Sequence, residues 1–206
     1  MAFNTNRWNR LRYTLWAPVY DLAGWLFDAR RRRSLELLAV RPGERVLVVG
    51  AGTGADLRYL EASATVLATD LTPAMLARAR PRLRRGWGAA VMDGHSLAVA
   101  TESVDAVVLH LILAVMPDPV SGLREVARVL RPGGRAVVFD KFVRGRPPAL
   151  LRAANLVSNA LFTDLTRSFH DILARSGAAL AIEHDERGPL GGLFRHLLLR
   201  RKDEAG

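Results

Sequence analysis

Apolar runs and amphipathic stretches alternate along most of this chain. The clearest run lies at residues 46–54 and reads VLVVGAGTG: four apolar, mostly β-branched residues pass directly into three glycines at alternate positions. This pattern predicts a buried parallel strand that ends in a tight turn. Glycine suits such a turn because it adopts positive φ and lets a ligand approach the backbone closely. A helix is expected after the turn, through residues 55–60.

The alternation continues beyond the glycine turn. Further strands are expected at 65–69, 89–92, 103–113 and 135–139, and amphipathic helices at 75–83 and 120–130. Strict alternation of buried strands and amphipathic helices indicates a parallel sheet that is covered on both faces. Ligands of such sheets bind at the carboxyl ends of the strands.

The pattern changes beyond residue 142. Helices are expected at 149–161 and 164–176, followed by strands at 178–183 and 193–199 across a glycine-rich loop. Two strands joined in that way are antiparallel neighbours. The predicted fold is therefore α/β: a Rossmann-like three-layer sandwich whose seven-stranded sheet is mostly parallel, with a reversed strand at one edge.

The N-terminal segment is amphipathic, with arginines opposite an apolar stripe. The stripe is formed by Trp8, Leu11 and Leu15. Such a helix, expected to end or kink at Pro18, is typical of a membrane interface, although a lid packed on the domain explains the same pattern. We therefore predict that residues 1–40 form amphipathic and basic helices, for membrane contact or as a lid, and that residues 41–206 form the main domain.

The charge of the chain is strongly positive and unevenly distributed. There are 30 lysine and arginine residues against 20 acidic ones, a formal net charge of +10. Residues 1–33 hold seven arginines and two aspartates, and a second basic cluster comprises Lys141, Arg144, Arg146 and Arg152. These patches favour binding to a polyanionic surface, either anionic lipid or nucleic acid.

The composition excludes several kinds of chemistry. The absence of cysteine excludes disulfides, thiolate metal sites and cysteine nucleophiles. The N-terminus lacks the apolar core and cleavage site of a secretory signal, and no run of about 18 apolar residues occurs. We therefore expect a cytoplasmic protein, peripheral to the inner face of the cell membrane, with a monomer favoured.

An acidic residue, Asp70, ends the second expected strand 20 positions after Gly50. At that place in mononucleotide-binding α/β folds a carboxylate binds the two hydroxyls of a ribose. The residue could instead serve as the N-cap of the helix that begins near Pro73. Its separation from the glycine turn favours ribose binding.

The glycine turn alone does not identify the ligand, because GAGTGA also satisfies the dinucleotide-binding pattern. Three further motifs accompany it: Asp70 with TPAML at 72–76, MDG at 92–94, and EVARVLRPGG at 125–134. Together the four motifs resemble class I S-adenosylmethionine-dependent methyltransferases. The resemblance is stronger to the branch with quinone-biosynthesis C-methyltransferases and bacterial phosphatidylethanolamine N-methyltransferases.

This resemblance implies S-adenosylmethionine as the methyl donor, S-adenosylhomocysteine as its product, and no metal. Gly50, Gly52 and Gly54 would pass beneath the methionine and ribose parts of the cofactor. Asp70 would hold the ribose hydroxyls, and Asp93 would face the adenine amino group. The other expected cofactor contacts are Ala51, Thr53, Leu71, Met75, Gly94 and His110.

One position departs from the family pattern. Val48 stands where the family usually has an acidic residue, so the backbone or another side chain must bind the amino group of the cofactor. Methyl transfer also requires an oriented nucleophile, which must be neutral if it is an amine. Tyr20 and His110 are the candidates for contact with the acceptor amine, although a histidine on an apolar strand is often only part of the core.

The resemblance and the basic, aromatic N-terminus favour N-methylation of phosphatidylethanolamine toward phosphatidylcholine. The expected headgroup contacts are Tyr20, Arg30, Arg31, Lys141, Arg144, Asn155 and Asn159. The expected partners are an anionic membrane surface and its phospholipids, without nucleic acid. A C- or O-methyltransferase of quinone precursors or other small molecules is the nearest alternative. A basic nucleic-acid-binding protein is disfavoured, because no recognised nucleic-acid module accompanies the basic patches.

Overall fold

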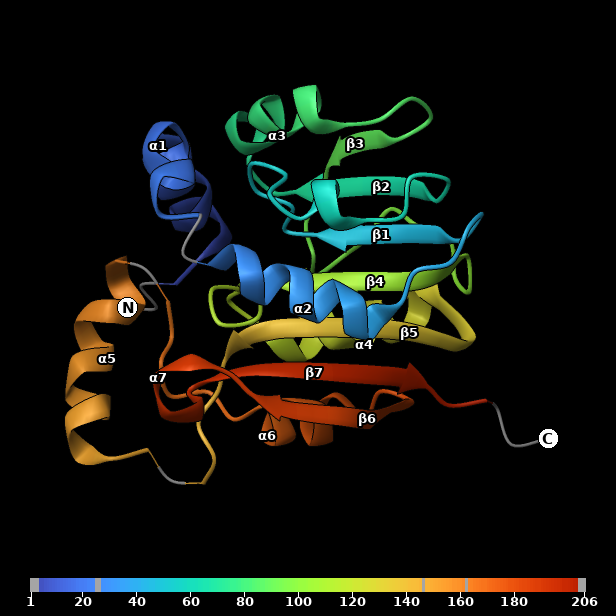
Figure 1. Ribbon diagram of the computed structural model, residues 1–206. Coiled ribbons are helices and arrows are strands. Elements are labelled where there is room, and N and C mark those ends of the chain that lie inside the picture. The colour runs from blue at the N-terminus through green and yellow to red at the C-terminus, as the bar shows by residue number, and fades with distance from the viewer. Residues whose placement is uncertain (1–3, 25–26, 146, 162, 204–206) are drawn as a thin grey trace.

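All seven apolar runs form strands of a single sheet in the computed structural model, which describes residues 4–24, 27–145, 147–161 and 163–203 (Figure 1). The strands are β1 (Arg45–Val49), β2 (Thr65–Asp70), β3 (Gly88–Val91), β4 (Val104–His110), β5 (Leu130–Lys141), β6 (Leu180–Arg187) and β7 (Phe194–Arg201). Their order across the sheet is β3-β2-β1-β4-β5-β7-β6.

The sheet is parallel from β3 to β5 and reverses at β7. β1 pairs in parallel with β2 and β4, while β7 runs antiparallel to both β5 and β6. The reversed strand therefore lies one place in from the edge, between β5 and the edge strand β6. This arrangement confirms the predicted α/β fold with a mostly parallel seven-stranded sheet.

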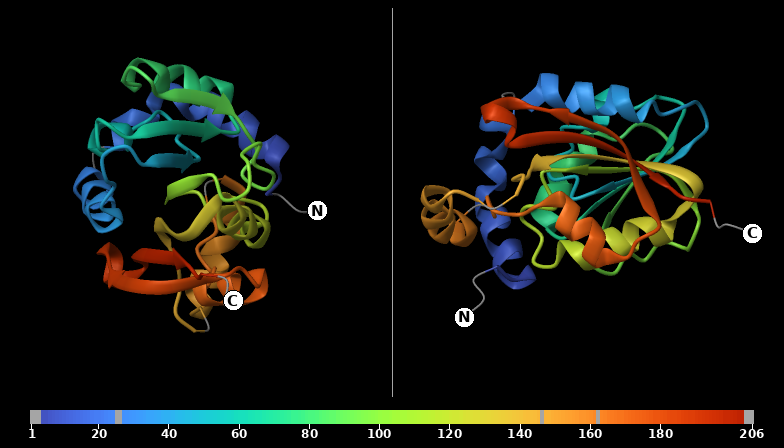
Figure 2. Two further views of the ribbon diagram at one scale, coloured as in Figure 1. Left: turned by 90° about the vertical axis from the view of Figure 1, so that its right-hand side faces the viewer. Right: turned by 90° about the horizontal axis from the view of Figure 1, so that it is seen from below.

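Helices cover both faces of the sheet and the carboxyl ends of its strands. The α-helices are α1 (Asn6–Gly24), α2 (Asp28–Leu38), α3 (Pro73–Ala79), α4 (Pro119–Val129), α5 (Ala149–Leu161), α6 (Phe169–Ser176) and α7 (Pro189–Gly192), with short 3-10 helices η2 (Leu57–Tyr59) and η3 (Arg80–Arg82). Figure 2 shows α2 on one face of the sheet and α4 with α6 on the other. The helices α1 and α5 lie beyond the carboxyl ends of the strands (Figures 1 and 2). Of the described helices, none is both long and apolar enough to cross a membrane.

Two hydrophobic clusters lie on opposite faces of the sheet because strand side chains alternate in direction. Leu47 points toward α4, where it joins Leu123 and Val126. Val48 points the other way, toward α2, where Leu35 and Leu38 are buried. Burial on both faces explains why the strands are apolar without interruption.

One local expectation was wrong, and one of the two outcomes expected at Pro18, an end of the helix, is excluded. The segment after the glycine turn forms turns and the short η2 in place of a longer helix through 55–60, because only ten residues separate Gly54 from β2 and the side chain of Asp56 is held by Arg31 and His110. The first helix does not end at Pro18, since α1 continues to Gly24. Proline removes one backbone hydrogen bond, and the remaining turns are sufficient to keep the helix continuous.

Candidate functional site

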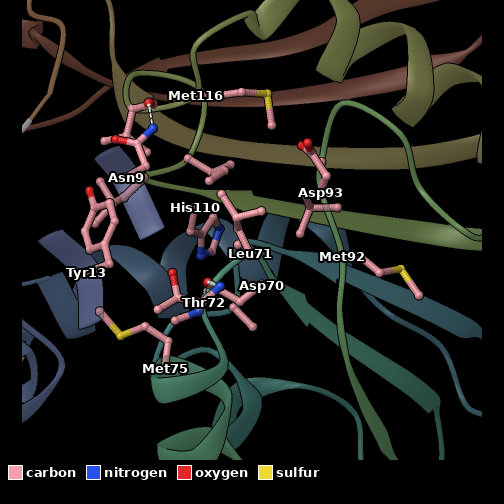
Figure 3. A pocket seen from close by; sticks show the side chains of 18 of the residues that line it. Asn9, Tyr13, Asp70, Leu71, Thr72, Met75, Met92, Asp93, His110 and Met116 are labelled. Carbon is pink, nitrogen blue, oxygen red and sulfur yellow. Dashed lines mark hydrogen bonds between the residues drawn. The ribbon is translucent and has the colours of Figure 1, made fainter. Parts of the chain in front are cut away.

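A cavity opens at the carboxyl ends of β1, β2 and β4. Its floor is the glycine turn after β1, one wall is the start of α3, and α1 closes it from outside (Figure 3). Asp70 and His110, from the ends of β2 and β4, point into it. A cavity at the carboxyl ends of parallel strands is a ligand site by position.

The glycines of the turn are required for different reasons. All three adopt positive φ, at +69° for Gly50, +55° for Gly52 and +81° for Gly54. A Cβ on Gly50 would lie 2.7 Å from the Cδ1 of Ile112, whereas a Cβ on Gly52 would meet nothing within 4 Å. Gly52 lines the cavity, so a side chain there would project toward the ligand's space. The turn is therefore a cradle for a ligand at Gly52 and a packing point at Gly50.

Asp70 fastens this turn to the end of β2. Its Oδ2 accepts a hydrogen bond of 2.9 Å from the backbone N–H of Gly52, and its Oδ1 accepts one of 2.8 Å from the N–H of Thr72. Burial raises the pKa of Asp70, and the two backbone donors partly offset that effect. The N-cap of α3 is Thr72, so Asp70 is not the cap residue. The carboxylate retains lone pairs that can accept hydrogen bonds from a ligand's hydroxyls.

Asp93 lies on the opposite wall and is bound by the N-terminal helix. The side-chain amide of Asn6 donates a hydrogen bond of 2.6 Å to Oδ2 of Asp93, and Nδ1 of His95 lies 2.5 Å from Oδ1. The amide of Asn9 donates to the carbonyl of Val115 at 3.0 Å. These contacts hold α1 across the mouth of the cavity.

The polar face of α1 supplies lining residues that sequence reasoning missed. Asn6, Asn9 and Tyr13 follow helical spacing and all three line the cavity. Asn9 and Tyr13 are labelled in Figure 3. Their i, i+3, i+7 spacing places them on one face of a helix, and the sequence carries this signal beside the stronger apolar stripe. The N-terminal helix therefore packs over the cavity, and these three side chains line it.

A network of buried polar side chains connects Asp56 to two residues that line the cavity. Asp56 accepts hydrogen bonds from Nη1 of Arg31 at 2.9 and 2.8 Å, and its Oδ1 lies 2.7 Å from Nδ1 of His110. Nε2 of His110 lies 2.9 Å from the hydroxyl of Ser34. Burial raises the pKa of Asp56, but His110 and Arg31 outweigh it and hold the pKa well below its usual range. The aspartate is therefore ionised, and the histidine presents Nδ1–H to it.

This network lies beside the position where the family's usual acid is missing. Val48 is packed in the apolar cluster under α2 and offers no polar group. Asp56, ionised and tied to two cavity-lining residues, Arg31 and His110, is the nearest described carboxylate in this network. Both carboxylate oxygens of Asp56 already accept hydrogen bonds. Asp56 therefore contributes negative charge to this part of the site and offers no free acceptor.

The structure brings most predicted cofactor residues together. Those that line the cavity are Gly50, Ala51, Gly52, Thr53, Asp70, Leu71, Met75, Asp93, Gly94 and His110. Gly54 lies outside this lining, because its Cα packs against α3, where a Cβ would come within 3.0 Å of the Cβ of Ala79.

The predicted headgroup residues are scattered and mostly paired within the chain. Arg31 binds Asp56, Lys141 lies 3.3 Å from Asp140, and Arg144 lies 3.0 Å from Asp185. Arg30 is exposed on α2, and Asn155 joins α5 to the backbone N–H of Leu165. The side chains of Tyr20 and Asn159 lie outside the described residues. Apart from Arg31, none of the described members of this group lines the cavity.

The family model and two relatives that match this sequence are all described as methyltransferases. Residues 47–138 match the family model described as a methyltransferase domain. A phosphatidylethanolamine N-methyltransferase from Cereibacter sphaeroides is 33% identical over 202 residues, which cover 92% of this chain and 96% of that protein. A demethylmenaquinone methyltransferase from Mycobacterium sp. (strain KMS) is 41% identical over 130 residues, which cover 63% of this chain but only 54% of that protein.

Solved structures agree on the fold. A chain in the complex between the Haloferax volcanii Trm112 methyltransferase activator and a methyltransferase superposes with a TM-score of 0.78, at 19% identity over 96% of this chain and 98% of that one. An S-adenosylmethionine-dependent methyltransferase from Mesorhizobium loti gives a TM-score of 0.65 at 23% identity, over 82% of this chain and 96% of that one.

Proposed function

This chain belongs to the S-adenosylmethionine-dependent methyltransferases, and we propose that it methylates the amine of phosphatidylethanolamine, toward phosphatidylcholine, at a membrane surface. The proposal rests on the two faces of α1. One face lines the cofactor cavity, and the other is apolar and exposed, so the helix that closes the site is also the helix that can lie in a lipid surface.

The described cavity fits the cofactor. The open space above Gly52 would admit the cofactor close to the backbone, Asp70 would accept hydrogen bonds from the ribose hydroxyls, and Asp93 would accept one from the adenine amino group. Arg31 also lines the cavity, where its guanidinium is already bound by Asp56. When bound, S-adenosylmethionine supplies an electrophilic methyl group on a sulfonium. The chain orients the acceptor and excludes water.

The exposed face of α1 is the observation that carries the proposal. Leu15 is 70% exposed and Leu11 is 54% exposed, and Trp8 and Trp16 are also exposed. Grouped apolar side chains on one helix face mark an interaction surface. Tryptophan in this setting is typical of the boundary between lipid and water.

The charge near α1 complements an anionic surface. Five exposed arginines lie between residues 78 and 85, on α3, η3 and the turn after them, and α3 packs against α1. The run at residues 30–33 contributes less than its sequence suggests, because Arg31, Arg32 and Arg33 are paired with carboxylates of the chain. Basic residues next to an apolar helix strengthen binding to anionic lipid.

An amine acceptor has to lose its proton before it attacks. Tyr13 and His110 are the described side chains placed to contact it, and the apolar wall formed by Leu71, Ile112 and Met116 disfavours the charged ammonium. His110 already uses Nδ1 toward Asp56 and Nε2 toward Ser34, so neither nitrogen takes the proton, and the amine loses it to water before entering the apolar part of the cavity. The ring of Tyr13 suits an increasingly methylated ammonium.

The experiment is transfer of a labelled methyl group from S-adenosylmethionine into a total bacterial lipid extract, followed by chromatography. The proposal expects label in monomethyl, dimethyl or trimethyl derivatives of phosphatidylethanolamine. Label in a quinone fraction alone would support the alternative that the demethylmenaquinone methyltransferase relatives suggest, and would overturn the phospholipid assignment.

A further inference from the structure

Arg12, on α1, is buried and has no counter-ion among the described residues. Arg12 is only 4% exposed, and its three guanidinium nitrogens have no hydrogen-bond partner among the described residues. Each of the other buried arginines in the described part of the chain is paired with a carboxylate. These pairs are Arg31 with Asp56, Arg135 with Glu44, Arg195 with Asp185, and Arg201 with Glu102.

A buried guanidinium without hydrogen bonds or a counter-ion is unfavourable, because the charge has lost its water and the ring of Tyr13 replaces only part of that interaction. A protein keeps such an arrangement where an anion completes it in the working state. Of the described buried arginines, Arg12 is the one whose binding capacity is unused by the chain.

The position of Arg12 indicates which anion. It lies between Asn9 and Tyr13 on α1, both of which line the cavity, and its guanidinium carbon is 5.0 Å from the centre of the Tyr13 ring. The exposed Trp8 and Trp16 lie one helical turn before and after it. Arg12 does not itself line the cavity, but on α1 it lies between the exposed apolar residues and the residues that do.

We propose that Arg12 binds the phosphodiester of the acceptor while the amine of the same headgroup passes Tyr13 toward the cofactor. The guanidinium fork matches two phosphate oxygens. This inference rests on the proposed function, because it assigns the phosphate of that substrate to a residue. It also explains why Arg31, Lys141 and Arg144, which are paired within the chain, need not serve this role.

Free phosphate and the phosphodiester of a lipid should differ in their affinity for Arg12. Because Arg12 is withdrawn from water, an acceptor has to displace neighbouring side chains to reach it. Free phosphate gains nothing from the apolar face of α1 and should bind far more weakly than a phosphodiester that carries acyl chains.

The test is titration of tryptophan fluorescence with monomeric dihexanoyl phosphatidylcholine, which has the phosphodiester but no amine to methylate. Arg12→Met should weaken binding at least about tenfold, Arg12→Lys should weaken it less, and Arg10→Met, which removes an exposed charge from the same helix, should leave it unchanged. Equal affinity for all four proteins would overturn the proposal, as would failure of the wild type to bind. Inorganic phosphate binding as tightly as the lipid would overturn the lipid assignment.

A second measurement separates binding from folding. Without ligand, Arg12→Met should raise Tm by about 2–4 °C, because an unpaired buried charge is replaced by an apolar side chain of similar length. A fall in Tm would show that Arg12 is structural and would overturn the proposal. If the wild type binds the lipid through Arg12 but methylates no phosphatidylethanolamine, the proposed reaction fails while the phosphodiester site stands.

Discussion

Nδ1 of His110 lies 2.7 Å from Oδ1 of Asp56, and both side chains are buried. The first residue ends β4 and the second follows the glycine turn, so this contact joins the two strand ends between which the cavity opens. Arg31 adds α2 to the same aspartate. One carboxylate therefore fixes three segments of the site relative to one another.

Replacing that carboxylate should destabilise the fold. Asp56→Asn leaves Arg31 buried without a counter-ion, which costs about 3–5 kcal/mol of unfolding free energy. Urea unfolding measures the loss. Glu36→Gln is the control, because Glu36 forms an exposed pair with Arg32 and its replacement should cost less than about 1 kcal/mol. Equal effects of the two substitutions would contradict the network's role.

Two glycine substitutions should distinguish an effect on the stability of the fold from an effect on affinity for the cofactor. Gly52→Ala and Gly43→Ala both place a Cβ at positive φ with nothing within 4 Å, so each should cost about 1–2 kcal/mol of stability. Only Gly52 lines the cavity, and only its variant should weaken S-adenosylmethionine binding, by about tenfold or more, in isothermal titration calorimetry. An unchanged cofactor Kd in Gly52→Ala would contradict the cradle.

Substitutions on the apolar face of α1 should weaken binding to lipid vesicles without changing the stability of the fold. The double variant Leu11→Ser, Leu15→Ser should weaken binding to vesicles that contain phosphatidylglycerol by at least about tenfold, because two exposed leucines no longer enter the lipid. Its Tm should match that of the wild type. Val91→Ser, at an exposed apolar position on β3, should leave vesicle binding unchanged. Undiminished sedimentation of the double variant with vesicles would exclude α1 as the contact.

A buried histidine predicts acid sensitivity. His196 is stacked on Phe139 at 4.7 Å, and both ring nitrogens lack partners among the described residues. Burial, opposed by Glu186 and assisted by His110, lowers the pKa of His196 to about 4. Above about pH 6.5 His196 is neutral in both the folded and the unfolded chain, so its titration does not change the unfolding free energy. As the pH falls from about 6.5 to about 4, the unfolded chain takes up a proton that the folded chain refuses, so stability decreases.

The size of that decrease is on the order of 2–3 kcal/mol. His196→Phe retains the ring stack and removes the titration, so its unfolding free energy should change less over this pH range than that of the wild type. Unfolding by urea at pH 7 and pH 4.5 measures the difference. Parallel pH profiles for the two proteins would show that another group is responsible.

The strands and the glycine turn were predictable because their signals are local. The run at 46–54 requires both the apolar strand and the positive φ, and Asp70 and Asp93 follow at strand ends that a parallel sheet must bring together. His110 entered the cavity for the same reason. These residues share one edge of the sheet, so topology alone gathers them.

The remaining parts of the site depend on contacts between distant segments. Which face of α1 turns inward is decided by its packing over the cavity, where Asn6 meets Asp93, and the apolar stripe alone left membrane contact and a lid as alternatives. Asp56 was expected within a helix, yet its side chain is held by Arg31 and His110. Charge runs were equally deceptive, because pairing within the chain occupies most of the arginines at 30–33.

The most direct test of the account is the initial rate of methyl transfer from labelled S-adenosylmethionine to phosphatidylethanolamine in vesicles, with and without phosphatidylglycerol. The account predicts methylated phosphatidylethanolamine as the product, formed faster on the anionic vesicles and at a rate that falls with added salt. A protein that binds S-adenosylmethionine but transfers no methyl group to phosphatidylethanolamine on either surface would contradict it.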